Sequence, residues 1–228
     1  MPRRGRAIEG GLAYHILNRG AGRMTLFDDA ADYRAFESVL AEALRRYPLR
    51  LLAYVVMPNH WHVVVWPRRD EGPRVSALFR WLTVTHAVRW RLHRHTVGTG
   101  PVYQGRFKSF PVAKDSHLLS VIRYVERNPL RAGLVRRAEL WQWGSLWRRT
   151  HGDGECRAVL SDWPVEVPRN WTARVNQPQT PAELDALRCC VLRGRPFGGD
   201  EWVHRMVARL GLESSIRPRG RPRKKEDE

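Results

Sequence analysis

The chain has 228 residues, of which 43% are hydrophobic, so it can bury the core of at least one domain. Lysine and arginine outnumber aspartate and glutamate by 40 to 23, and the formal net charge of +17 favours a polyanionic partner, above all nucleic acid. The three cysteines lack metal-binding spacing, and no apolar run reaches the roughly 20 residues of a membrane-spanning helix. We therefore expect a soluble, intracellular protein that is neither disordered, nor a zinc finger, nor disulfide-stapled.

Strand and helix signals alternate through the first 130 residues. In chain order, the pattern predicts a strand at 11–18, a helix at 28–47 capped by Asp28 or Asp29, strands at 49–57 and 60–66, a helix at 75–95, a strand at 106–113 and a helix at 115–128. This βαββαβα order predicts an α+β fold: a ferredoxin-like antiparallel sheet with helices on one face.

The pattern weakens after this region. Three tryptophans crowd into LWQWGSLW, where buried packing is a better interpretation than base stacking. Thr180 and Glu183 have the spacing of a capping box and predict a helix start. The predicted organisation is a main domain at 1–140, an irregular Trp- and Pro-rich connection at 141–179, a small helical extension at 180–213 and a disordered basic tail at 214–228.

A pair of histidines stands at the head of a predicted strand, in MPNHWHVVVW. His60 and His62 are two residues apart, so their side chains point to the same face, which suits a metal better than a core. Two satisfied histidines at a strand end remain an equal alternative. A histidine-triad hydrolase is disfavoured, since Val64 stands where its third histidine would fall.

The helix at 115–128 supplies a candidate nucleophile and a further ligand. Tyr124 falls off the centre of the apolar face of this helix, and Asn128 lies one turn further on, beside it. In isolation, a tyrosine at the rim of the core and a helix-ending Asn-Pro pair would explain both residues.

Three stretches together carry a family resemblance. MPNHWHVVV, YQGRFKSF and RYVERNPLRAGLV resemble the motifs of REP-associated tyrosine transposases, which are relatives of the single-tyrosine HUH transposases of small insertion sequences. The resemblance continues through RGRPFG and RPRGRPRK and covers most of the chain. Trp61 is bulky for the middle position of the HUH motif but is still apolar.

The resemblance implies a role for each of these residues. In that family, both histidines and a polar residue four positions after the tyrosine bind a divalent metal, and the tyrosine is the nucleophile. Carried over, His60, His62 and Asn128 are the metal ligands and Tyr124 attacks. The resemblance implies Mg²⁺ as the cofactor, with Mn²⁺ as the alternative.

The implied function is a metal-dependent endonuclease and strand transferase that acts on single-stranded DNA. It would cleave and rejoin hairpins of repeated extragenic palindromes (REP) through a 5′-phosphotyrosine intermediate. We expect hairpin or single-stranded DNA as the partner, no membrane partner and a cytoplasmic, nucleoid-associated protein. Monomer and homodimer stay open. Two alternatives are a non-catalytic, architectural DNA-binding protein and a metal-dependent nuclease that forms no covalent adduct.

Basic segments add candidate DNA contacts. RGRP occurs at 193–196 and 219–222 and resembles the AT-hook, whose arginines enter a narrow minor groove. For the first copy a structural turn is an equal explanation. A solvated strand edge would equally explain the basic residues at 106 and 108. The residues predicted to contact DNA are Arg106, Lys108, Arg217, Arg219, Gly220, Arg221, Arg223 and Lys224.

Overall fold

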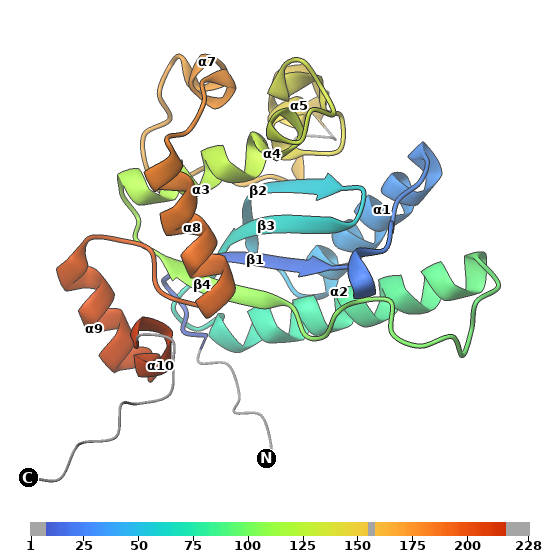
Figure 1. The fold of residues 1–228 in the computed structure, drawn as a ribbon, viewed down its shortest axis with the longest axis horizontal. Helices are drawn as coiled ribbons and strands as arrows, with labels where there is room; N and C mark the ends of the chain where they lie inside the picture. The colour runs from blue at the N-terminus through green and yellow to red at the C-terminus, as the bar shows by residue number, and fades with distance from the viewer. Residues whose placement is uncertain (1–7, 155–157, 218–228) are drawn as a thin grey trace, which may run out of the picture.

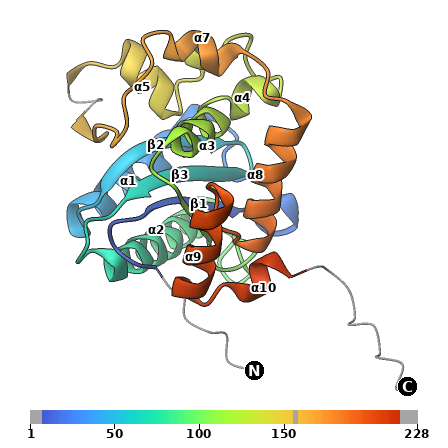
Figure 2. The ribbon, with the colours of Figure 1, turned by 90° about the vertical axis from the view of Figure 1, so that its left-hand side faces the viewer.

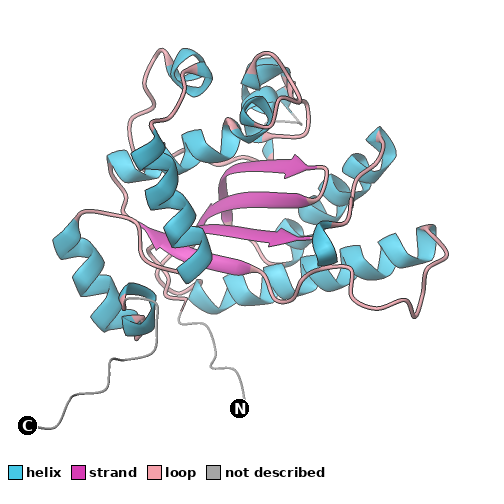
Figure 3. Ribbon diagram, in the orientation of Figure 1, coloured by secondary structure: helices cyan, strands magenta, loops and turns pink. Residues whose placement is uncertain are grey.

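The computed structural model describes residues 8–154 and 158–217. At its centre is a four-stranded antiparallel sheet with the strand order β2-β3-β1-β4 (Figure 1). The strands, magenta in Figure 3, are β1 (Ala13–Arg19), β2 (Arg50–Met57), β3 (His60–Trp66) and β4 (Lys108–Val112). This ferredoxin-like order confirms the α+β fold that the sequence predicts.

Helices cover both faces of the sheet rather than the one face predicted (Figure 2). The helices α1 (Ala30–Arg46) and α2 (Gly72–His93) pack on one face, and α3 (Ser116–Glu126) and α8 (Pro181–Arg193) pack on the other. The second face needs cover because the strands are apolar on both sides. The shorter helices are α4 (Asn128–Arg131), α5 (Ser145–His151), α7 (Trp171–Asn176), α9 (Asp200–Leu210) and α10 (Glu213–Ile216), with 3₁₀ turns at Ala21–Arg23 and Ala138–Leu140. None of the described helices is long and apolar enough to cross a membrane.

Local signals place most helix ends where the sequence predicts them. Asp29, one of the two predicted caps, accepts hydrogen bonds from the first backbone N–H groups of α1. Thr180 and Glu183 form the predicted capping box of α8. Gly194, with φ of 70°, ends α8, so the first RGRP copy forms a helix-ending turn.

The segment 141–179 covers an edge of the sheet and contains α5 and α7, so only part of it is irregular. The indole of Trp141 donates to the carbonyl of Val56 at 2.9 Å, and the indole of Trp163 donates to that of Leu52 at 2.9 Å. The ring of Trp143 stacks on that of Tyr33. The contacts of Trp141 and Trp143 agree with the packing interpretation of these tryptophans. The two indole hydrogen bonds occupy carbonyl groups of β2 that an edge strand would otherwise expose.

The other edge of the sheet is covered too. The backbone of Phe197 exchanges two 2.9 Å hydrogen bonds with Pro111 and Ala113 beside β4. At the far end of the chain, α10 extends to Ile216, so the first residues of the predicted disordered tail form a helical turn.

A buried polar chain runs from β3 through Tyr103 to α2 and anchors Trp61. The Trp61 indole donates to the Tyr103 hydroxyl at 3.2 Å, and this hydroxyl lies 2.8 Å from His86 Nδ1. Trp61 is fully buried on the face of α1 and α2, which explains why a bulky residue is accommodated between the two histidines. Burial lowers the pKa of His86 to about 4.

We expect His86 to make the fold less stable in mild acid. Below its usual pKa of 6.5, the unfolded chain takes up a proton that the folded protein refuses down to about pH 4. As the pH is lowered through this window, the free energy of unfolding should therefore decrease, by up to about 1.4 kcal/mol per pH unit for this one proton. In His86→Asn, an amide oxygen can still accept from Tyr103. Urea unfolding between pH 4.5 and 6.5 should then show a free energy of unfolding that depends less steeply on pH, because one proton fewer is taken up on unfolding. The unaltered protein, measured in parallel, gives the reference slope.

Candidate active site

The hairpin between β2 and β3 positions the two predicted histidines. Pro58 and Asn59 form its tight turn, and β3 begins at His60. Pairing with β1 sets Arg19 opposite His60 and Leu17 opposite His62. The two imidazole ring centroids lie 5.0 Å apart, as the predicted shared face requires.

Helix α3 brings Tyr124 over this face. The Tyr124 ring lies edge-on to that of His62, with centroids 5.8 Å apart, and the guanidinium of Arg131 lies over it at 4.4 Å. The Tyr124 side chain is 7% exposed, and its hydroxyl has no hydrogen-bond partner among the described residues. The structure thus brings together the predicted nucleophile and the predicted histidines.

The helix junction after Tyr124 differs from the prediction. Pro129 does not stop the helix; it occupies the first turn of α4, where a missing N–H is tolerated. Arg127 keeps helical dihedral angles between α3 and α4, and its N–H bonds to the carbonyl of Arg123 at 2.9 Å. Asn128 therefore stays one turn beyond Tyr124 and is buried, at 3% exposed.

A buried carboxylate holds α3 in place behind the site. Glu126 accepts from the Ser145 hydroxyl at 2.6 Å and from the Trp171 indole at 2.7 Å. Burial raises the pKa of this carboxyl group. Both partners belong to the segment 141–179, so residues beyond the predicted main domain fix the helix that carries Tyr124.

Each histidine of the pair is oriented through its Nδ1 atom. His60 Nδ1 lies 2.7 Å from Asn59 Oδ1, and His62 Nδ1 lies 2.9 Å from Nε2 of His15 on β1. Neither Nε2 atom has a hydrogen-bond partner among the described residues. Metal-binding histidines commonly use one ring nitrogen for the metal and the other for such an orienting contact.

The electrostatic surroundings keep both imidazoles neutral. Burial, with a smaller effect of Arg19 and Arg131, lowers the pKa of His60 to about 3. Burial also holds the pKa of His62 well below its usual value. A neutral imidazole is the form that binds a metal, so neither ring has to lose a proton first.

The donor set fits a divalent cation if Asn128 supplies its amide oxygen. Among residues 8–154 and 158–217, no group of three His, Cys, Asp and Glu side chains could hold a metal, so an amide is needed. The Oδ1 atom of Asn128 accepts from Arg131 at 2.9 Å and keeps a second lone pair. Its Nδ2 atom is buried without a partner, an unsatisfied donor that suits an anionic oxygen.

Two site residues escaped the sequence-based prediction. His15 is fully buried in the middle of β1, and Arg131 stands inside RNPLRAG without an assigned role. A histidine within a strand of apolar residues was the available signal, because a buried imidazole is costly unless it is paired. Arg131 carried no signal beyond the resemblance.

The predicted DNA-contacting residues fall into two groups. Arg106 and Lys108 are exposed and line a groove of about 250 Å³ that also includes Arg19, the residue paired with His60. The carbonyl of Arg217 accepts from the guanidinium of Arg193. The remaining predicted contacts, Arg219, Gly220, Arg221, Arg223 and Lys224, lie outside the described residues.

The family model described as "Transposase IS200 like" matches residues 10–128, a span that includes β1 to β4, both predicted histidine ligands, Tyr124 and Asn128. The chain belongs to the IS200-like transposase family. The match ends at Asn128, so the C-terminal part that covers both sheet edges lies beyond this family model.

Individual relatives agree with the resemblance to REP-associated tyrosine transposases. This IS200-like transposase is 22% identical over 160 residues to the REP-associated tyrosine transposase of Escherichia coli K12, covering 70% of this chain and 88% of that protein. A Haemophilus influenzae protein named for the same group is 21% identical over 134 residues, covering 56% of this chain and 74% of that one. The solved structure of a REP-associated tyrosine transposase bound to a REP hairpin shares the fold, with a TM-score of 0.51 and 21% identity, and covers 74% of this chain and 93% of that one.

Proposed function

We propose that this transposase cleaves and rejoins single-stranded DNA at REP-type hairpins through a covalent bond between Tyr124 and a 5′ phosphate. The observation that carries the proposal is the placement of Tyr124 against His62, with the Arg131 guanidinium over its ring. The similar protein solved with a REP hairpin supports the choice of substrate. Arg19, Arg106 and Lys108 line a groove beside the histidines, where they can hold phosphates of the same strand.

The chemistry balances with Tyr124 as nucleophile. Its phenol oxygen loses a proton and forms a bond to phosphorus, while the bond from phosphorus to the 3′ oxygen breaks and this oxygen takes up a proton. The Arg131 guanidinium places positive charge beside the attacking ring. A phenol is a better leaving group than an alkyl alcohol, so a 3′-hydroxyl can reverse the step and rejoin the strand.

We propose His60, His62 and Asn128 as the residues that hold Mg²⁺ or Mn²⁺. When bound, the cation would supply Lewis-acid polarisation of the scissile phosphate. The chain's own contribution is to present both imidazoles in the neutral form and to keep a lone pair on Oδ1 of Asn128, which accepts one hydrogen bond from Arg131. Its unsatisfied Nδ2 donor would then face a phosphate oxygen.

His15 should act as a positioning residue for His62. If Nε2 of His62 binds the cation, its Nδ1 carries the proton and donates to Nε2 of His15, at the observed 2.9 Å. His15→Leu removes this acceptor, and we expect Mn²⁺ affinity to fall by roughly 10- to 100-fold, as for other lost orienting contacts. Calorimetric titration with Mn²⁺ in the absence of DNA measures this directly.

The conservative variant His15→Gln provides the control. Its amide oxygen can replace the lost acceptor, so Mn²⁺ affinity should recover in part while the packing around β1 is altered in both variants. Equal Mn²⁺ affinities of the His15→Leu variant and the unaltered protein would contradict a positioning role.

A labelled hairpin tests the proposed function. The protein is incubated with single-stranded hairpin DNA carrying a label 3′ of the cleavage site and with Mg²⁺ or Mn²⁺, then run on a denaturing protein gel. A labelled band at the mass of the protein supports the tyrosine mechanism. Cleavage without such a band would point to a nuclease without an adduct, and hairpin binding without cleavage to an architectural protein.

A further inference from the structure

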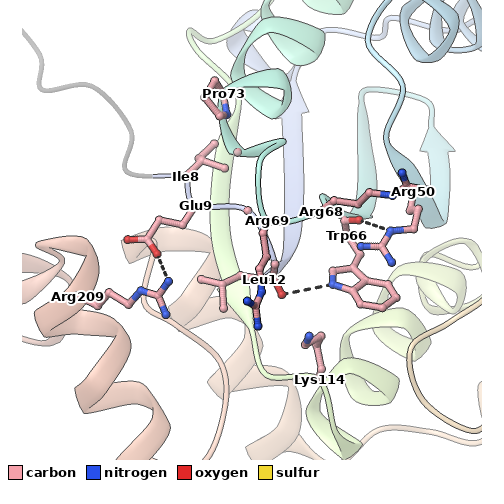
Figure 4. A pocket seen from close by; sticks show the side chains of 13 residues that line it. Ile8, Glu9, Leu12, Arg50, Trp66, Arg68, Arg69, Pro73, Lys114 and Arg209 are labelled. Atoms are coloured by element: carbon pink, nitrogen blue, oxygen red, sulfur yellow. Dashed lines mark hydrogen bonds and ion pairs between the residues drawn. The ribbon is translucent and has the colours of Figure 1, made fainter.

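A second basic cavity, drawn in Figure 4, is lined by Lys114, which lies just before α3 at the opposite end of that helix from Tyr124. It has a volume of about 820 Å³ and opens between the segment before β1, the loop before α2 and the end of β4. Figure 4 shows its positively charged side chains, of which Arg209 lies away from Trp66, beside Glu9. They are Arg50, Arg68, Arg69, Lys114 and Arg209.

Most of this charge is not neutralised within the protein. Glu9 is the carboxylate that lines the cavity, and it pairs with Arg209 at 2.5 Å. In the described part of the chain, Arg68, Arg69 and Lys114 form no ion pair, and all three are exposed. Like charges that outnumber their counter-charges in this way form a site for an anion.

Backbone hydrogen bonds and close packing hold the walls of the cavity in place. The Arg68 backbone N–H donates to the Glu71 carboxylate at 2.7 Å, and the Gly11 N–H donates to the carbonyl of Pro67 at 2.9 Å. A Cβ atom at Gly72 would lie 2.6 Å from the carbonyl oxygen of Ile8, so the two segments pack backbone against backbone. This packing fixes the backbone from which Arg68 and Arg69 project.

The indole of Trp66 organises the inner wall. The Arg50 guanidinium lies 3.4 Å from the Trp66 ring centroid and its Nε donates to the Trp66 carbonyl at 2.9 Å. The Lys114 ammonium lies 5.0 Å from the same ring, and the indole N–H donates to the Gly11 carbonyl. Two cations held at one aromatic ring, in a cavity that Arg68 and Arg69 also line, suit the oxygens of phosphate groups.

The cavity lies in line with the candidate active site. His60 begins β3 and Trp66 ends it, and six residues of strand span about 20 Å. Both residues lie on the face that α3 covers, with Tyr124 toward one end of this helix and Lys114 just before the other. Because a duplex rises about 3.4 Å per base pair, 20 Å corresponds to about six base pairs of a hairpin stem.

We infer that this cavity binds backbone phosphates of the DNA substrate, as a second anchor away from the cleavage site. The inference rests on the proposed function, since it takes the hairpin as the ligand. The cavity is open, and Arg68, Arg69 and Lys114 are exposed, so a DNA backbone that runs along the surface can reach them. Contacts of this kind position the duplex without reading its sequence.

Paired charge substitutions test the inference through binding alone. Hairpin affinity is measured by fluorescence anisotropy in EDTA, between 50 and 200 mM salt, for the unaltered protein and for Arg68→Gln/Arg69→Gln. Affinity falls as salt rises, and each lost phosphate contact makes the slope of log affinity against log salt less steep by about 0.9. Over this salt range the unaltered protein should therefore lose about tenfold more affinity than the double variant.

A matched control separates the cavity from net charge. Arg34→Gln/Arg45→Gln removes two exposed arginines from α1, on the opposite face of the sheet, and should keep the original salt slope. Equal behaviour of the two double variants would overturn the cavity assignment and leave the proposed function standing. Failure of the unaltered protein to bind any hairpin would overturn both.

Two further measurements identify the ligand. Neutral methylphosphonate linkages, introduced one at a time in the hairpin, should include positions that weaken binding of the unaltered protein but not of Arg68→Gln/Arg69→Gln. Calorimetry with inorganic pyrophosphate tests whether the cavity instead binds a small phosphate-containing molecule. Saturable pyrophosphate binding that the double substitution abolishes, with hairpin affinity and salt slope unchanged, would overturn the DNA assignment.

Discussion

Tyr124→Phe should abolish the covalent protein–DNA band and lower hairpin cleavage by more than about 10³-fold, as expected when a catalytic nucleophile is lost. The substitution removes a single oxygen atom. The Tyr124 hydroxyl has no hydrogen-bond partner among the described residues, so the ring can keep its contacts with His62 and Arg131. Folding and hairpin affinity should therefore be unchanged. A denaturing gel with labelled hairpin reports the adduct, and anisotropy in EDTA reports binding.

The matched control is Tyr33→Phe, which removes the same atom from another buried tyrosine. Tyr33 stacks on Trp143 in the core on the opposite face of the sheet and has no part in the candidate site. This variant should form the adduct as the unaltered protein does. An adduct that persists in Tyr124→Phe would show that another residue attacks and would refute the assignment of Tyr124.

His60→Ala should weaken Mn²⁺ binding, and the loss should be measurable in the absence of DNA. One of the two imidazole ligands is lost, so the affinity should fall by more than the roughly 10- to 100-fold typical of losing an orienting contact alone. Adduct formation should fall with it. His60 is half-buried at the start of β3, so its truncation should perturb the fold less than that of the fully enclosed His62. Calorimetry and the free Mn²⁺ signal in electron paramagnetic resonance both report the change.

His117→Ala is the corresponding control for a lost imidazole. His117 is also half-buried, but its ring lies against Phe197 near the start of α3. Mn²⁺ affinity and adduct formation should match those of the unaltered protein. Unchanged Mn²⁺ affinity in His60→Ala would instead support the alternative of two satisfied histidines at a strand end.

Local sequence patterns accounted for most elements of the fold. Strand alternation, the Asp29 cap and the Thr180–Glu183 capping box depend on residues a few positions apart, so they can be recognised without tertiary contacts. The pattern did not show that Pro129 starts a new helical turn. It also did not show that segment 141–179 covers β2, since its indoles bond to carbonyls about a hundred residues away.

The printed residues alone were enough to predict the βαββαβα order, the shared face of His60 and His62, and the one-turn spacing of Tyr124 and Asn128, because each depends on periodicity or spacing between residues close together in the chain. The side chains that these residues contact follow from the folded chain. The contact of His15 with His62 joins residues 47 positions apart and depends on the register between β1 and β3. The basic cavity around Trp66 likewise collects cations from separate segments. Such sites depend on strand register and long-range packing, which no short-range pattern encodes.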